Sequence, residues 1–323
     1  MCAKKFIVLF NPIQMNKFIV TGGAGFIGSH LVEFLSSNGN TVIIIDDLSS
    51  GHLVNVKNLK GEIFIFKCGV ADFDFNSIDD VECVFHLAAQ ASVPYSIDHF
   101  VESSTKNLVG TFKVIDFCTK KGIPLVYATS SSVYGNLPLG KEDSDIQLLS
   151  PYATDKYCME MYAKAYYNLK GLSSFGLRFF NVYGPKQDAS NPYSGVISIF
   201  VDRLIKGEPI TVYGGYQTRD FVFVDDVVNC IFKAYKYLLL NKVAKVSNVL
   251  TGQSISINHL VKCISGIIEI DPLCIYEELP NGDPEISLGS VDQMENLLEV
   301  NSCDFKLIEF GLEKTIDYFK NKE

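Results

Sequence analysis

The chain has 323 residues, of which 47% are hydrophobic and 20% charged, and a formal net charge of -9 at pH 7. This hydrophobic share excludes a disordered chain, and the length favours one large domain or two unequal ones. The acidic balance argues against non-specific binding of nucleic acid, which needs clustered lysine and arginine. Nine cysteines without a C-x-x-C pair predict reduced thiols in a cytoplasmic protein.

Residues 1–14 are expected to be a dispensable extension. Two lysines before the apolar run Phe6–Phe10 resemble a signal peptide, but the run is short and no small-residue cleavage site follows it. Pro12 interrupts any element that continues from upstream, and "MNKFIVTGG" is typical of a strand leading into a loop. The folded chain is therefore predicted to begin at Met15. No apolar run approaches the ~20 residues of a membrane-spanning helix.

From Met15 onward, short β-branched or aromatic runs alternate with helical patterns. Strands are predicted at Lys17–Val20, Thr41–Ile45, Ile63–Phe66, Val81–His86, Leu125–Tyr127 and Phe175–Phe180, and helices near Phe26–Ser37, Asn107–Lys120 and Pro151–Lys170. Apolar strands that alternate with helices predict a parallel sheet covered on both faces. The fold class is therefore α/β, a doubly wound parallel (Rossmann) sheet with a smaller, irregular α/β domain. We expect the Rossmann domain over 15–185, with parts of the later chain returning to it, and a mainly substrate-binding domain over 186–323.

A glycine-rich loop, "TGGAGFIG", follows the first predicted strand and opens the first predicted helix. Its spaced glycines, Gly22, Gly25 and Gly28, permit a tight turn, a close approach to a pyrophosphate and packing of helix on strand. The amino end of the helix offers N–H groups and a partial positive charge to the phosphates. Asp46 ends the second predicted strand, where an acidic side chain binds the adenosine ribose diol and repels a 2′-phosphate. The sequence therefore predicts bound NAD rather than NADP.

Tyr152 and Lys156 form a Y-x-x-x-K pair at the start of the long third helix. The spacing alone is uninformative, because it recurs twice later in the chain. Ser150 is a favourable N-cap and Pro151 a favourable first-turn residue, which places Tyr152 in the first helical turn. There the helix dipole and the charge of Lys156, one turn along the same face, are expected to lower the tyrosine pKa toward neutrality. This pair is the predicted general base and its partner.

A cluster of hydroxyl side chains, "ATSSSVYG", follows the predicted strand Leu125–Tyr127. Ligand chemistry collects where parallel strands end in this architecture. Ser130 and Ser131 are therefore candidate substrate ligands.

Six segments in order resemble the extended short-chain dehydrogenase/reductases: "TGGAGFIGSH", "HLAAQASVPYS", "YATSSSVYG", "SPYATDKY", "LRFFNVYGP" and "TRDFVFVDDV". Each segment is weak alone, and the ordered set is highly specific. Within that family the chain looks most like UDP-sugar C4-epimerases of the UDP-N-acetylglucosamine type, from about Met15 to about Gly311. The resemblance implies an NAD-dependent isomerase acting on a UDP-sugar. It also implies a homodimer formed through the helices at Asn107–Lys120 and Tyr152–Lys170.

The resemblance assigns roles by motif position. Ser130 would hydrogen-bond the sugar O4, Tyr152 would be the base, and Lys156 its partner and ribose ligand. The implied cofactor contacts are Gly22, Gly25, Phe26, Ile27, Gly28, Asp46, Val70, Leu87, Ala88, Ala89, Asn107, Tyr152 and Lys156. The implied substrate contacts at the diphosphate are Asn181 and Arg219, and those at the uracil are Val196 and Tyr213. The other implied substrate contacts are Ser130, Ser131, Asp283 and Ser287. No metal site is expected.

Two positions depart from the family pattern. Where the third strand ends, the family usually has Gly-Asp-Ile/Val, whose acid binds the adenine amino group, and this chain has Cys68-Gly69-Val70. Pro280 stands in place of a second diphosphate-binding arginine, before Asn281-Gly282-Asp283. Losing one charge-assisted donor to a diphosphate costs about 1.5–3 kcal/mol unless another cation replaces it.

The sugar is predicted from a position that faces the C2 substituent in such epimerases. Counting from Pro280, this position is Ser287. A tyrosine there resembles enzymes restricted to glucose and galactose, whereas a small residue leaves room for an N-acetyl group. We expect interconversion of UDP-GlcNAc and UDP-GalNAc, with UDP-Glc and UDP-Gal as weaker substrates. Ile286 and Leu288 give the alternating apolar pattern of a strand around Ser287.

Other functions stay open. Related sugar 4,6-dehydratases and UDP-glucuronate decarboxylases carry acids where Ser131 and Ser132 stand, and neither acid is present. A UDP-glucuronate 4-epimerase remains an alternative, because it too has a serine-rich "SSSVYG". The other alternative is a non-catalytic NAD-binding sensor, against which the intact set of Ser130, Tyr152 and Lys156 argues.

Overall fold

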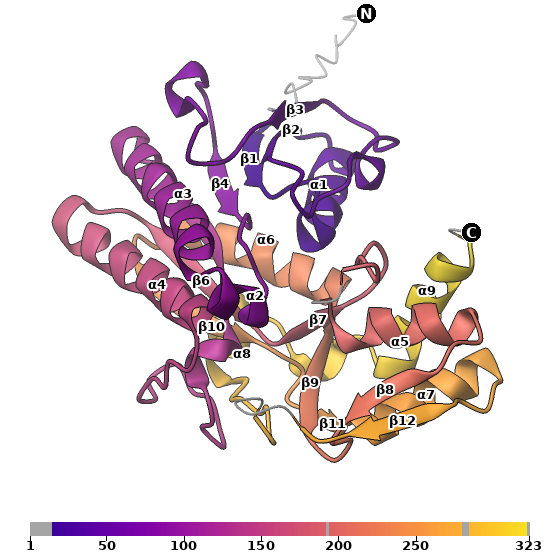
Figure 1. Cartoon of the computed structure of the whole chain (residues 1–323). Coiled ribbons are helices and arrows are strands. Elements are labelled where there is room, and N and C mark those ends of the chain that lie inside the picture. Colours follow the sequence, from indigo (N-terminus) through magenta and orange to yellow (C-terminus); the bar gives the residue numbers. More distant parts are fainter. Residues whose placement is uncertain (1–14, 192–193, 280–283, 322–323) are drawn as a thin grey trace, which may run out of the picture.

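The computed structural model describes residues 15–191, 194–279 and 284–321. Its largest element is a seven-stranded sheet in the order β10-β6-β5-β4-β1-β2-β3, in which every neighbouring pair is parallel (Figure 1). The strands are β1 (Lys17–Thr21), β2 (Thr41–Asp46), β3 (Ile63–Lys67), β4 (Cys83–His86), β5 (Leu125–Ser130), β6 (Ser174–Phe179) and β10 (Ala244–Val249). The strand order reverses between β1 and β4, which is the switch point where this architecture binds ligands. The predicted Rossmann fold is confirmed.

Helices cover both faces of this sheet. The helices are α1 (Phe26–Ser37), α2 (Val93–Asp98), α3 (Phe100–Lys121), α4 (Pro151–Lys170), α6 (Val224–Leu240) and α8 (Asp292–Leu298). Alternate residues of one strand enter different cores: Val20 packs with α1 and α6, while Ile19 packs with α3 and α4. The side chains of the inner strands β1, β2 and β4 are mostly apolar on both faces because neither face meets water, whereas those of β3, at the edge of the sheet, are mostly exposed.

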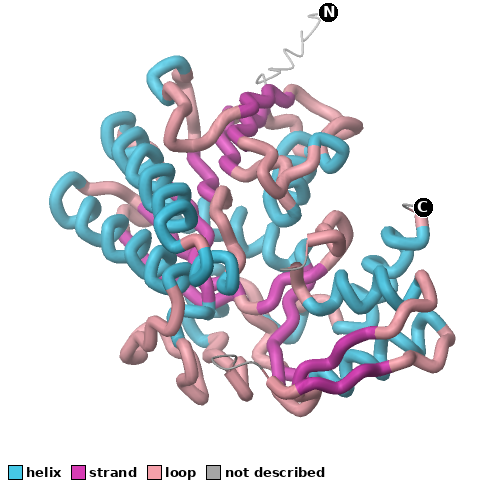
Figure 2. The backbone as a smooth tube through the Cα atoms, viewed as in Figure 1, coloured by secondary structure: helices cyan, strands magenta, loops and turns pink. Residues whose placement is uncertain are grey.

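A smaller unit lies beside the carboxyl edge of the sheet, at the lower right of Figure 1. Its strands are β7 (Asn181–Tyr183), β9 (Thr218–Phe223) and β11 (Ser254–Ser256) in one sheet, and β8 (Ile210–Tyr213) and β12 (Cys274–Glu277) in another. Its helices are α5 (Val196–Ile205), α7 (Ile257–Ile268) and α9 (Ile308–Lys320), which share a third core with β8 and β9. Figure 2 shows the paired strands β8 and β12 at the side of this unit away from the central sheet.

Several elements differ in extent from the prediction. The helix expected from Asn107 begins at Phe100, directly after α2, which Ser92 caps by accepting a hydrogen bond from the Tyr95 amide. The strand expected over Leu125–Tyr127 runs on to Ser130. Among the described residues no helix has the length and apolar character needed to cross a bilayer. The eight cysteines in that part of the chain are all free thiols, as expected.

Candidate active site

The glycine loop joins β1 to α1 with the geometry that a bound dinucleotide needs. Gly22 has φ +70°, and a Cβ there would lie 2.8 Å from the Ala88 backbone. A Cβ on Gly28 would overlap the Gly22 carbonyl oxygen. Gly25 is the N-cap of α1 and no side chain caps that end, so the first-turn N–H groups of Phe26 and Ile27 are available to an anion. The loop therefore fits a pyrophosphate.

Asp46 lies at the carboxyl end of β2 and is 6% exposed. Its Oδ2 accepts a hydrogen bond from the Ala24 amide at 2.9 Å, and its Oδ1 accepts one from the Leu48 amide at 2.8 Å. Each carboxylate oxygen has a second acceptor site, so a ribose diol can still bind. The hydrogen bond from Ala24 shows that Asp46 also holds the glycine loop in place, which the sequence did not predict. The negative charge of Asp46 suits NAD.

The loop after β4 carries Leu87, Ala88 and Ala89. The Leu87 amide donates to the Thr21 carbonyl, and the Ala88 amide to Thr21 Oγ1, both at 3.2 Å. His86 Nδ1 forms a hydrogen bond of 2.7 Å with Thr21 Oγ1. Burial lowers the pKa of His86 to about 3, so the ring is neutral. The loop is fixed against β1 at the switch point of the sheet.

Val70 and Asn107 are both associated with α3: Val70 packs on it and Asn107 is part of it. Val70 follows β3 and packs on α3, where a Cβ on Gly110 would lie 3.2 Å from its Cβ. Asn107 is buried on α3, accepts a hydrogen bond from the Gln90 amide at 2.8 Å and donates to Asp155 Oδ2 at 3.0 Å. Asn107 therefore ties the loop after β4 to α4.

Ser130, Tyr152 and Lys156 meet at the carboxyl end of β5. Ser130 is the last residue of β5, and its Oγ accepts a hydrogen bond from the Ser132 amide at 3.1 Å. Tyr152 is in the first turn of α4, which Ser150 caps as predicted. Lys156 is buried, its Nζ donates to the Ala128 carbonyl at 2.9 Å, and Nζ lies 5.8 Å from the centre of the Tyr152 ring.

The predicted lowering of the Tyr152 pKa is wrong. Burial raises the pKa of Tyr152, and a hydrogen bond with Ser130 offsets only part of that rise. Burial likewise lowers the pKa of Lys156 to about 8, against the opposing charge of Asp155. The reason is desolvation, which disfavours both the phenolate and the ammonium and outweighs the helix dipole and the nearby charge.

Sequence reasoning missed a further contact of Tyr152, the predicted base. The Tyr152 amide donates to Ser96 Oγ at 3.2 Å, and Ser96 is fully buried on α2. Helix α2 therefore fixes the first turn of α4. The signal was present in "ASVPYS", where a serine and a proline mark a helix start.

The predicted diphosphate ligands lie on neighbouring strands of the smaller unit. Asn181 begins β7 and donates to the Asp220 carbonyl at 3.2 Å, and β7 pairs with β9. Arg219, on β9, donates from Nη1 to the Pro284 carbonyl at 2.7 Å. Pro280 and Asp283 lie outside the described residues.

The remaining substrate candidates are spread more widely. Ser131 opens the short 3₁₀ helix η3 (Ser131–Tyr134), Val196 is the first residue of α5, and Tyr213, 45% exposed, ends β8. Ser287 is bound to β9 through its amide, which donates to the Thr218 carbonyl at 3.1 Å.

The strand expected around Ser287 is wrong. Ile286 forms one isolated bridge with Thr218 and is 49% exposed. The chain leaves β9 after this bridge because it turns toward Gly140, whose amide donates to the Leu288 carbonyl at 2.8 Å.

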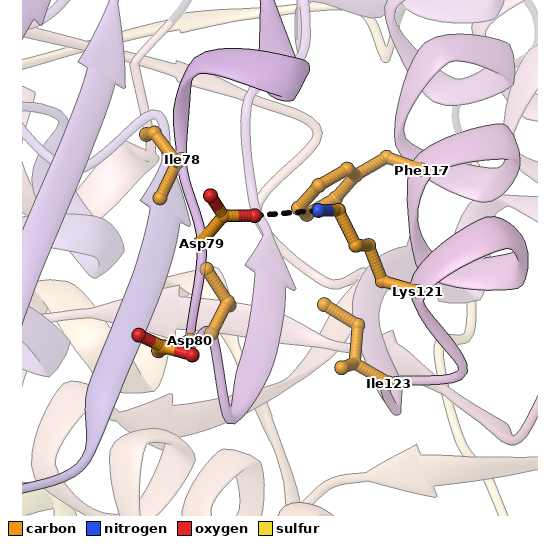
Figure 3. Close-up of a pocket in the computed structure, with 7 residues that line it drawn as sticks. Ile78, Asp79, Asp80, Phe117, Lys121 and Ile123 are labelled. Atoms are coloured by element: carbon orange, nitrogen blue, oxygen red, sulfur yellow. Dashed lines mark hydrogen bonds and ion pairs between the residues drawn. The ribbon is translucent and has the colours of Figure 1, made fainter.

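A hollow elsewhere on the surface does not belong to this site. It is lined by Ile78, Asp79, Asp80, Val81, Phe117, Lys121 and Ile123 (Figure 3). These residues precede β4 and β5 or end α3, so the hollow lies at the amino edge of the sheet. Lys121 Nζ and Asp79 Oδ1 pair there at 2.7 Å. The predicted ligands within the described part of the chain lie at or beyond the opposite, carboxyl edge.

The fold and the site define an NAD-binding α/β enzyme of the extended short-chain dehydrogenase/reductase class. Residues 18–249 match the model of the NAD dependent epimerase/dehydratase family, and the chain belongs to this family. It is 36% identical to a putative UDP-glucose 4-epimerase of Methanocaldococcus jannaschii, over 94% of this chain and 98% of that protein. It is 30% identical to a UDP-N-acetyl-alpha-D-glucosaminuronate decarboxylase of Bacillus cytotoxicus, over the same shares.

Solved structures agree with this assignment. One is the UDP-N-acetylglucosamine 4-epimerase from Methanobrevibacter ruminantium M1 in complex with UDP-N-acetylmuramic acid. It is 34% identical, has a TM-score of 0.88, and the match covers 96% of this chain and 99% of that one. The predicted family and the predicted NAD cofactor are confirmed.

Proposed function

We propose that this protein is a UDP-sugar C4-epimerase that interconverts UDP-GlcNAc and UDP-GalNAc and acts more weakly on UDP-Glc and UDP-Gal. The observation that carries the proposal is the meeting of Ser130, Tyr152 and Lys156 at the same edge of the sheet as the glycine loop. The proposed enzyme is a cytoplasmic homodimer.

The chain's own residues have distinct roles in this reaction. Tyr152 takes the proton of the sugar 4-hydroxyl and later returns it, and Ser130 holds O4 by a hydrogen bond. Lys156 supplies positive charge beside the phenolate. NAD, when bound, supplies the hydride acceptor and donor together with a positively charged ring. Gly22, Gly25, Phe26, Ile27, Gly28, Asp46, Val70, Leu87, Ala88, Ala89, Asn107, Tyr152 and Lys156 are the residues proposed to hold it.

Two serines argue against loss of a substituent from the sugar. Ser131 and Ser132 stand at the start of η3, where dehydration or decarboxylation would call for an acid. A hydroxyl cannot serve as a general acid for a poor leaving group near neutral pH as a carboxyl group can. A UDP-glucuronate 4-epimerase is the second candidate, which the serine-rich "SSSVYG" favours.

The choice of sugar rests on Ser287. Its side chain is small and half-buried, and its backbone is held against β9. Space at this position would admit an N-acetyl group. Asn181 and Arg219 are proposed to bind the diphosphate, with Val196 and Tyr213 at the uracil and Ser131 and Asp283 as further ligands.

The proposed dimer face is the pair α3 and α4, which lie side by side at the left of Figure 1. Its exposed apolar side chains are Phe100, Val101, Val109, Phe112, Met161, Tyr162 and Leu169. These exposed apolar side chains support the proposed dimer face. A purified protein that is monomeric by light scattering would contradict this part of the proposal.

The function is tested by incubating the purified protein, with no added cofactor, with UDP-GlcNAc, UDP-Glc or UDP-glucuronate and separating the products by chromatography. We expect UDP-GalNAc from the first at the highest rate. A product only from UDP-glucuronate would favour the second candidate. Conversion of none of the three, in protein shown to contain NAD, would refute an epimerase of these sugars.

A further inference from the structure

A series of buried polar side chains crosses the sheet behind the candidate site. Thr129, the residue before Ser130, donates to Glu160 Oε1 on α4 at 2.7 Å. Glu160 binds Arg178 on β6 through two hydrogen bonds of 2.9 and 2.6 Å, and Arg178 Nη1 donates to Tyr134 Oη at 2.9 Å. Glu160 is 6% exposed, Arg178 3% and Tyr134 4%. The buried charges are therefore compensated, as they must be away from water.

Tyr134 extends this network toward the smaller unit. Its hydroxyl donates to Asn248 Oδ1 at 2.6 Å, and Asn248 is fully buried at the end of β10. Asn248 Nδ2 in turn donates to the carbonyl oxygens of Gly140 at 3.1 Å and Ser290 at 3.2 Å. Gly140 accepts a hydrogen bond from the Ser290 amide at 3.0 Å. The hydroxyl of Tyr134 thus orients the amide that holds these two backbone segments together.

The segment held in this way contains Ser287. We call residues 284–290 the connecting segment, because it runs from β9 to Gly140. At one end, the Ser287 amide donates to the Thr218 carbonyl at 3.1 Å, and Ser254 Oγ donates to the Ser287 carbonyl at 2.7 Å. At the other end, the segment depends on Gly140 and Asn248. The position of the Ser287 side chain is therefore set by contacts from both units of the protein.

We propose that the Tyr134 hydroxyl is a positioning group for sugar selection, which acts by fixing the connecting segment through Asn248. The proposal rests on the proposed function, since it assumes that Ser287 lies against the sugar. Tyr134 has no role in proton transfer here, because its hydroxyl is committed to Arg178 and Asn248. Burial raises its pKa to about 12, which keeps the hydroxyl protonated and able to donate.

The anchoring is tested by hydrogen exchange in Tyr134→Phe. The substitution leaves Asn248 Oδ1 and Arg178 Nη1 without this partner, so the Asn248 amide keeps only its two Nδ2 bonds and is held less firmly. We expect faster exchange in the peptide that covers the connecting segment. Tyr235→Phe is the matched control, because Tyr235 is equally buried and donates to Glu82 at 3.1 Å, next to the amino end of β4. The control should leave that peptide unchanged.

The effect on selection is tested by titrating wild type and both variants with UDP, UDP-Glc and UDP-GlcNAc in a calorimeter. Tyr134→Phe should weaken the binding of UDP-GlcNAc by roughly tenfold, as expected for loss of one buried hydrogen bond, and leave the affinity for UDP unchanged. Tyr235→Phe should leave all three affinities unchanged. Equal losses for UDP and UDP-GlcNAc would indicate general damage and overturn the proposal.

The two levels of inference fail in different ways. If wild type binds none of the three ligands, the proposed function is wrong, and hydrogen exchange still decides whether Tyr134 anchors the connecting segment. If wild type binds UDP-GlcNAc and Tyr134→Phe matches wild type in both measurements, the positioning role is wrong and the proposed function stands. Should Tyr134→Phe not fold, Asn248→Ser replaces it, because it removes both carbonyl contacts and leaves Arg178 bound to Tyr134.

Discussion

The sharpest test of the site is Tyr152→Phe, because it removes one oxygen with its hydrogen bond to Ser130 and leaves the backbone and cap contacts in place. The amide of residue 152 still donates to Ser96, Ser150 still caps α4, and Lys156 still binds the Ala128 carbonyl. Loss of a general base costs ~10²–10⁴-fold in rate. We expect the upper part of this range, because the substitution removes the hydroxyl at the helix end altogether. NAD should remain bound.

The assay measures conversion of UDP-GlcNAc by chromatography and bound NAD after denaturing the protein. Tyr166→Phe is the matched control: it lies on the same helix and begins a Y-x-x-x-K pair of the same spacing, but it packs against the core of α3 and α4. It should keep wild-type turnover. Retention by Tyr152→Phe of more than about a tenth of wild-type turnover would refute the assignment, since even the lower bound for a lost base exceeds that loss.

Asp46→Ala should narrow the preference for NAD over NADP, because the carboxylate at the end of β2 repels a 2′-phosphate. The measurement is the ratio of the two dissociation constants. Wild-type protein that binds NADP as tightly as NAD would contradict this role of Asp46. Burial lowers the pKa of Lys156 to about 8 in the protein without NAD, and a positive ring beside it would lower this pKa further. Turnover at saturating sugar should therefore decline at or below that pH as Lys156 loses its proton. A pH profile that is flat well above pH 8 would show that the ammonium is not needed. Ser287→Tyr should abolish activity on the N-acetylated sugars by steric exclusion and spare UDP-Glc and UDP-Gal, as the two substrate pairs assayed side by side would reveal. Equal loss or equal retention of both activities would mean that Ser287 does not select the sugar.

The sequence predicted those parts of the fold and site whose signals are local. The glycine loop, the acid at the end of β2 and the Ser150-Pro151 helix start each occupy a few consecutive residues, and each has the predicted structure. Contacts between distant elements could not be predicted in this way. Tyr134 and Asn248 are 114 residues apart, and nothing in either neighbourhood indicates the other. The prediction of a strand around Ser287 was wrong for the same reason, because the backbone partners of this segment, Thr218 and Gly140, are distant in the sequence.

The pKa of Tyr152 shows why local reasoning also failed for the chemistry. Tyr152 lies at the helix end with Lys156 near its ring, as predicted, but burial acts on both groups and favours the neutral form of each. In a site of low dielectric, a single added charge has a large effect on such a pair. The positive ring of bound NAD would favour the phenolate that burial disfavours. If Tyr152 is the base, as proposed, it would then become effective only in the NAD-bound protein, when the hydride acceptor is present.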